Sequence, residues 1–116
     1  MEFMLDKKQV LEQFRIPDFI LKTQQQIHKD FSVQGLTVND ILLDKELDYE
    51  AIFSIVTDAL SAVMRLGERQ LLQLNYQIDI PQSQFLEAIT EENPIEELAA
   101  LIIRREAYKV YLRTKF

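Results

Sequence analysis

The sequence predicts an all-α protein, a compact bundle of about five to six helices around a long central helix. Hydrophobic residues recur at three- and four-residue spacings along much of the chain, which is the period of an amphipathic helix. Only two glycines and three prolines occur among 116 residues, so there is little material for hairpin turns. Several segments also open with residues that commonly start helices.

Length and composition indicate one domain spanning residues 1–116. Hydrophobic residues make up 47% and charged residues 28%, which argues against a disordered chain. The longest apolar runs, such as 98–103, fall far short of the ~20 residues that a membrane-spanning helix needs. The first residues have too short an apolar stretch for a signal peptide, and cysteine is absent. We therefore expect a cytoplasmic protein without disulfides and without a membrane partner.

Before the longest pattern, the chain predicts two amphipathic helices and a short third one. The first covers residues 6–14 and ends before Pro17, because proline disfavours helical backbone in the residue that precedes it. A second helix is expected to begin at Pro17 itself and to run to about Phe31. Gly35 marks a break, and a short helix over about 38–43 follows, opened by Thr37.

The longest hydrophobic pattern runs from Asp48 to about Leu74 and predicts the central helix. Asp48 can accept hydrogen bonds from free amides of the first turn. Gly67 lies inside this pattern, so either the helix ends there, with Gly67 in the left-handed cap position, or it continues while another helix crosses closely. The apolar positions are Ile52, Ile55, Val56, Ala59, Leu60, Val63, Leu66, Leu71 and Leu74.

Residues 72–80 are ambiguous, because apolar and polar residues alternate there as in a strand. Leu71, Leu74 and Ile78 also suit a helix, and a lone strand would need an edge to pair with. We favour helix to about Gln77, and an α+β fold with a short strand near 72–80 is the alternative. After Pro81, a short helix is expected over 82–89.

The last helix has the clearest start in the chain, with Asn93 at the cap, Pro94 at the first helical position and Glu96 at the third. Its apolar residues cover more than one face, which suggests that a partner covers one of them. They are Ile95, Leu98, Leu101, Ile102, Ile103, Val110, Tyr111 and Leu112.

Charge is unevenly distributed in this chain. The formal net charge is -6, yet residues 104–116 contain five basic residues and one acidic residue. An acidic body with a basic final helix lacks the broad basic face on which nucleic-acid binding relies, so we expect no nucleic-acid partner.

The leading functional prediction is a small non-catalytic protein that acts through helix-mediated self-association, as a homodimer, or through binding another protein. The expected interaction surface lies on the last helix and consists of Ile103, Arg105, Lys109, Val110, Tyr111 and Arg113. Its expected complement across a two-fold axis is the acidic segment formed by Asp40, Asp44, Glu46 and Glu50.

Catalytic signals are weak, and we expect no cofactor and no metal. The single histidine, His28, stands in no helical metal-binding pattern, and no serine lies in a nucleophile turn. One alternative is a metal-dependent all-α phosphohydrolase that uses Glu96 and Glu97 of the last helix together with Glu91 and Glu92. A second alternative is binding of nucleic acid or a nucleotide through the basic last helix.

Overall fold

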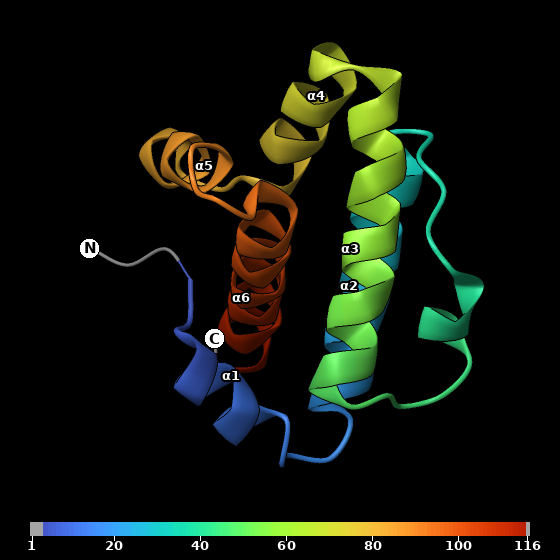
Figure 1. The fold of residues 1–116 in the computed structure, drawn as a ribbon. Helices are drawn as coiled ribbons and strands as arrows, with labels where there is room; N and C mark the ends of the chain where they lie inside the picture. The colour runs from blue at the N-terminus through green and yellow to red at the C-terminus, as the bar shows by residue number, and fades with distance from the viewer. Residues whose placement is uncertain (1–3, 116) are drawn as a thin grey trace.

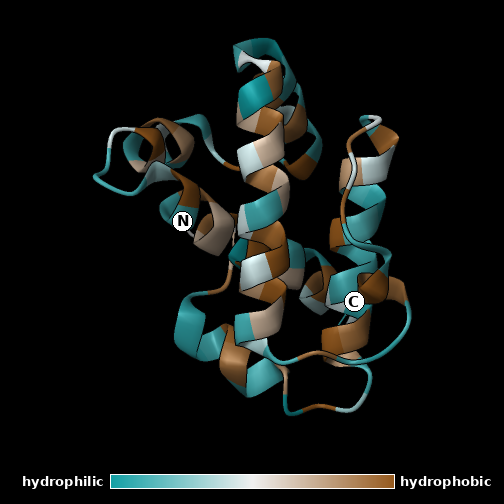
Figure 2. Ribbon diagram, turned by 45° about the vertical axis from the view of Figure 1, so that its right-hand side comes forward, coloured by the Kyte–Doolittle hydropathy of each residue, from teal (hydrophilic) through white to brown (hydrophobic). Residues whose placement is uncertain are grey.

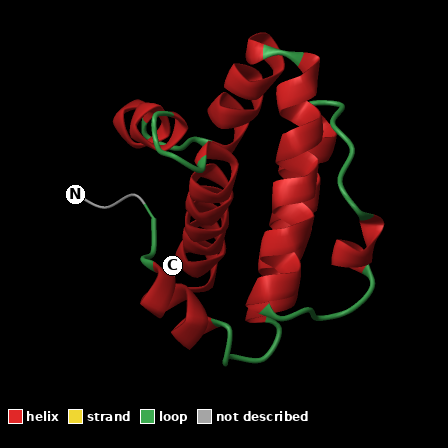
Figure 3. Cartoon of the chain, in the orientation of Figure 1, coloured by secondary structure: helices red, strands yellow, loops and turns green. Residues whose placement is uncertain are grey.

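Helices dominate the structure. The computed structural model describes residues 4–115, and that range contains six α-helices and one 3₁₀ helix. They are α1 (Lys7–Gln13), α2 (Phe19–Val33), η1 (Asp40–Leu43), α3 (Tyr49–Leu66), α4 (Glu68–Ile78), α5 (Gln82–Ile89) and α6 (Pro94–Lys115). The part of the chain drawn in Figure 3 as helix or loop has no strand. The all-α prediction is confirmed, and the alternative strand near 72–80 is wrong, because α4 takes up most of that range.

The helix with the most packing partners is α6, which contacts each of the other five α-helices. Residues 48–74, which the sequence predicts as the central helix, form α3 and the first part of α4 beside it (Figure 1). The physical reason is that α6 is apolar on more than one side. Buried positions such as Leu98, Ala99 and Ile103 cannot all share one narrow stripe, so α6 needs neighbours on several sides.

Gly67 separates α3 from α4. Its backbone angles, φ 126° and ψ 172°, fall in a region that is open essentially to glycine alone. The chain reverses at this residue, so that α4 packs back against α3 (Figure 1). Of the two possibilities for this glycine, the one in which the helix ends there is confirmed, but Gly67 does not adopt the expected left-handed cap conformation, because its ψ of 172° is extended.

Helix starts follow local sequence signals in three places. Asp6 and Gln9 form a reciprocal capping box at α1, the Asp48 side chain accepts from the amide of Ala51 at 2.8 Å, and Pro94 is the first residue of α6. At α5 the observed bounds, 82–89, are the predicted ones.

Two other starts differ from the prediction. The second helix begins at Phe19 rather than at Pro17, because Asp18 adopts a left-handed conformation with φ 67° and turns the chain first. The short third helix is a 3₁₀ helix, and its cap is Asn39, whose side chain accepts from the amide of Ile41 at 3.0 Å. Thr37, the predicted opening residue, lies before it.

One hydrophobic core runs through the bundle, whose extents are 37 × 33 × 24 Å. Hydrophobic and hydrophilic residues alternate along the helices in Figure 2, as expected for elements that bury one side. The segment before α1 is fastened to α6, because Arg104 Nε donates to the carbonyl of Leu5 at 2.8 Å and the Leu5 amide lies 3.4 Å from the Arg104 carbonyl. Within residues 4–115, no helix combines the length and hydropathy that crossing a membrane requires.

Candidate functional site

Three ionisable side chains meet between α2 and α6, and we call Asp30, Glu106 and the partly exposed Lys109 the buried triad. Asp30 is 2% exposed and Glu106 is fully buried. Lys109 Nζ lies 2.7 Å from Asp30 Oδ2 and 2.9 Å from Glu106 Oε1. Glu106 and Lys109 are three residues apart, so they share one face of α6, and that face meets α2.

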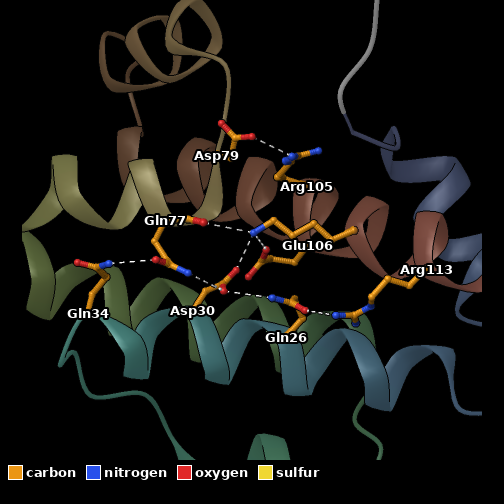
Figure 4. Close-up of polar contacts among 9 residues, drawn as sticks. Gln26, Asp30, Gln34, Gln77, Asp79, Arg105, Glu106 and Arg113 are labelled. Carbon is orange, nitrogen blue, oxygen red and sulfur yellow. Dashed lines mark hydrogen bonds and ion pairs between the residues drawn. The ribbon is translucent and has the colours of Figure 1, made fainter.

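Side-chain amides extend the triad into a polar seam across α2, α4 and α6 (Figure 4). Asp30 Oδ1 accepts from Gln26 at 3.1 Å and from Gln77 at 3.4 Å. At the ends of the seam, Gln34 donates to Gln77 Oε1 at 3.1 Å and Arg113 donates to Gln26 Oε1 at 2.6 Å. Most polar atoms around the Asp30 carboxylate are therefore satisfied, as burial demands.

Burial, together with the neighbouring Asp30, holds the pKa of Glu106 well above its usual value. Burial acts in the same direction on Asp30, but hydrogen bonds from Glu106 and Lys109 outweigh it and lower the Asp30 pKa. As a carboxylate, Glu106 would have the Lys109 ammonium 2.9 Å from Oε1, and within the described residues Oε2 would have no donor. A proton on Glu106 lets it donate to Asp30, which leaves one buried negative charge opposite one ammonium group.

The triad has the groups for proton transfer, but the larger clefts lie elsewhere. One of 510 Å³ follows α4, and one of 430 Å³ lies between α1 and α6. Neither is lined by a member of the triad. We therefore interpret the triad as a device that fixes how α2 faces α6, since a shift of either helix would leave a buried charge without its partner.

The basic residues predicted for the interaction surface lie together on α6 but contact their own chain. Arg105 Nη2 lies 3.2 Å from Asp79 Oδ2, Lys109 belongs to the triad, and Arg113 bonds Gln26. A four-residue spacing shows that side chains share a face, and it does not show whether that face points inward. Their use in binding a partner stays a prediction.

The apolar members of that predicted surface are largely inside the protein. Ile103 and Val110 are fully buried in the core. Tyr111 is half-buried and stacks on Tyr108, with 6.4 Å between the ring centroids. For a partner to reach Ile103 or Val110, α6 would have to leave the bundle.

The predicted acidic segment lies at η1 and at the start of α3, where Asp40, Asp44, Glu46 and Glu50 are exposed. Asp40 Oδ1 is 2.8 Å from Nε2 of His28, so the histidine is held by a carboxylate twelve residues away. Among residues 4–115, ion pairs join Arg105 to Asp79 and join Lys109 to Asp30 and Glu106. A contact between the segment and a second copy stays a prediction.

The glutamates of the metal-dependent alternative, Glu91, Glu92, Glu96 and Glu97, are exposed. Among residues 4–115, no group of three or more histidine, aspartate or glutamate side chains is arranged to hold a metal ion. A metal-dependent activity stays an untested alternative.

A surface groove on the outer side of α4 is the feature that the sequence analysis missed, and we call it the α4 groove. Tyr76 is 86% exposed and Leu72 is 48% exposed, which is unusual for side chains of this size four residues apart on one helix. Val33, next to Gln34 in sequence, is also exposed. The groove is lined by Gln34, Glu68, Arg69, Leu72, Gln73 and Tyr76.

A signal for this groove was present in the alternation that resembled a strand. Leu71, Leu74 and Ile78 form the inner face of α4 and are buried. Leu72 and Tyr76 are the apolar and aromatic residues of α4 that do not belong to this inner face. Their four-residue spacing assigns them to a second face of the same helix.

Comparison of the chain with known protein families, with curated protein sequences and with solved structures gave no match.

Proposed function

We propose that this protein is non-catalytic and acts by binding a protein chain through the α4 groove. The observation that carries the proposal is the pair of exposed side chains Leu72 and Tyr76, which line a shallow groove together with polar residues. Exposed apolar surface with a polar rim is typical of protein interaction sites, and tyrosine is enriched among residues that dominate such contacts.

We assign the contact to α4 rather than to α6, because Ile103 and Val110 are committed to the core. The basic residues of α6 likewise have partners within the chain, as Lys109 and Arg113 illustrate. The absence of cysteine suits action in the reducing cytoplasm, which we retain as part of the proposal.

A photo-cross-linking experiment tests the proposal. The analogue p-benzoylphenylalanine is introduced at Tyr76 in the full chain, and the cells that express it are irradiated. Leu86 on α5 is the control, because it is also a large exposed side chain but lies outside the α4 groove. We expect a discrete cross-linked product from position 76 and none from position 86. Equal or absent cross-linking at both positions would refute the proposal.

A further inference from the structure

The outer face of α4 has an arrangement that can pair with itself. Arg69, Leu72 and Tyr76 are spaced by three and four residues, which is the a, d, a spacing of a helix–helix seam. Arg69 and Tyr76 are nearly two turns apart, so they are separated by about 10.5 Å along the helix axis. Leu72 lies between them.

Arg69 and Tyr76 lie at the two ends of this helix–helix seam. Within residues 4–115, Tyr76 makes no ring stacking or cation contact, and neither Glu68 nor Arg69 forms an ion pair. Other tyrosines in the chain do meet cations: Arg105 lies 5.7 Å from the ring centre of Tyr108. A cation over a tyrosine ring is favourable at exposed sites, so an unpaired arginine and an unpaired tyrosine on one face are potential partners.

A two-fold axis beside Leu72 and Gln73 would bring these groups together. With two α4 helices antiparallel across it, Arg69 of one copy comes level with Tyr76 of the second copy, and the reverse contact forms at the same time. The two Leu72 side chains meet near the axis. An antiparallel pair also sets the positive end of each helix dipole beside the negative end of the other.

Local charge favours this face for contact between two copies. The chain as a whole carries -6, so most approaches of two copies are repulsive. On the α4 groove, the opposite charges of Glu68 and Arg69 balance each other. Repulsion between two copies is therefore lower at this face than the net charge of the chain implies. Moderate salt, which screens the remaining repulsion, should not dissociate the pair.

From these observations we propose that the occupant of the α4 groove is the α4 helix of a second copy of this chain, packed antiparallel with Arg69 against Tyr76 in both directions. This inference rests on the proposed function and names its partner. An 11-residue helix is only about 16 Å long, so the interface falls below the ~1,200 Å² of stable complexes. The dimer is therefore weak and forms at high concentration.

Engineered cysteines test the pairing, because the chain has none of its own. Gln73→Cys puts a thiol beside the proposed axis, and Gln82→Cys puts one on the exposed surface of α5 as the matched control. Under mild oxidation, we expect disulfide dimers of Gln73→Cys to form at least about tenfold faster than those of Gln82→Cys, because pairing raises the effective thiol concentration. The double variant Gln73→Cys with Tyr76→Ala should lose that advantage. Equal rates for the two single variants would overturn the inference.

Sedimentation equilibrium of the unmodified chain, up to about 1 mM because small interfaces are weak, gives an independent measure. We expect a mass that rises above 13.7 kDa with concentration, and no rise for Tyr76→Ala. A constant 13.7 kDa overturns the pairing. If position 76 nevertheless cross-links to a different protein, the proposed function survives with another occupant. If it cross-links to nothing, both proposals fail.

Discussion

The ammonium nitrogen of Lys109 lies 2.7 Å from the carboxylate of Asp30, although the two residues are 79 positions apart. The Asp30 side chain is almost fully buried, so its charge depends on this partner and on the hydrogen bonds around it. Several expected outcomes follow from this contact and from the geometry of the helices that carry it.

Replacement of Lys109 with Met would leave the Asp30 carboxylate without its cation. Breaking a buried pair by removing one partner typically lowers the free energy of unfolding by about 3–5 kcal/mol. Urea denaturation measures this loss, and Lys22→Met on the exposed side of α2 is the control. Adding Asp30→Asn to Lys109→Met should recover part of the loss, because no buried charge remains. If the changes in the free energy of unfolding caused by the two single substitutions simply added up in the double variant, the pairing of Lys109 with Asp30 would be contradicted.

The pH dependence of stability should depend on Glu106. Its pKa is raised in the folded protein, so the unfolded chain releases this proton first as the pH rises above the ordinary value of 4.5. The contribution of Glu106 to the free energy of unfolding is complete below that value and is lost as pH rises through the folded pKa. Glu106→Gln cannot titrate, and its amide can still donate to Asp30.

Melting temperatures measured from mildly acidic to alkaline pH check this expectation. The stability of Glu106→Gln relative to the natural chain should increase with pH. Asp30 has a lowered pKa, so its contribution is present above 3.8 and is lost only as the pH falls further. Parallel profiles for the two proteins would mean that Glu106 is already ionised in the folded state.

Gly67→Ala should destabilise the protein by about 1–3 kcal/mol, because φ 126° and ψ 172° are strained for any residue with a Cβ. Space is not the cause, since the nearest atom to an added Cβ would be Gln70 Oε1 at 3.4 Å. Gly35→Asn is the matched control, because its φ of 70° is one that asparagine tolerates. Similar losses at both positions, measured by urea denaturation, would show that the turn at Gly67 can relax.

Ile102→Asp should unfold the protein, because Ile102 is almost fully buried on α6 and a charge there would have no partner. The expected loss is more than about 4 kcal/mol. Circular dichroism and thermal melting report the result, with Leu86→Asp as the control because the Leu86 side chain on α5 is exposed. An Ile102→Asp protein that melts at the usual temperature would contradict the assignment of this residue to the core.

Sequence reasoning succeeded where the physical cause is local. The capping role of Asp48 and the position of Pro94 at the start of α6 depend on groups within one helical turn. For Gly67, the sequence left open whether the helix ends or continues, and the structure shows that it ends. The start of α2 was missed by two residues because the left-handed turn at Asp18 has no clear signature.

The candidate sites were harder to predict, because they depend on contacts between distant segments. The spacing of Arg105, Lys109 and Arg113 correctly indicates a shared face of α6. Lys109 contacts Asp30 only because α2 packs against that face. Asp30 is 79 positions away in the sequence, so the spacing on α6 gives no sign of this contact. Likewise, the exposure of Tyr76 follows from which side of α4 meets the core, and the alternation of residues 72–80 does not fix that side.

The hydrogen bonds between Leu5 and Arg104 should affect the folding rate of the chain. These residues are 99 positions apart, so this contact closes a loop that contains nearly the whole described chain. Most helical bundles fold in microseconds to milliseconds because their contacts are local, and distant contacts slow that search. The refolding rate of this chain should therefore be low for a helical protein, with the docking of the first helix on the last as a late event.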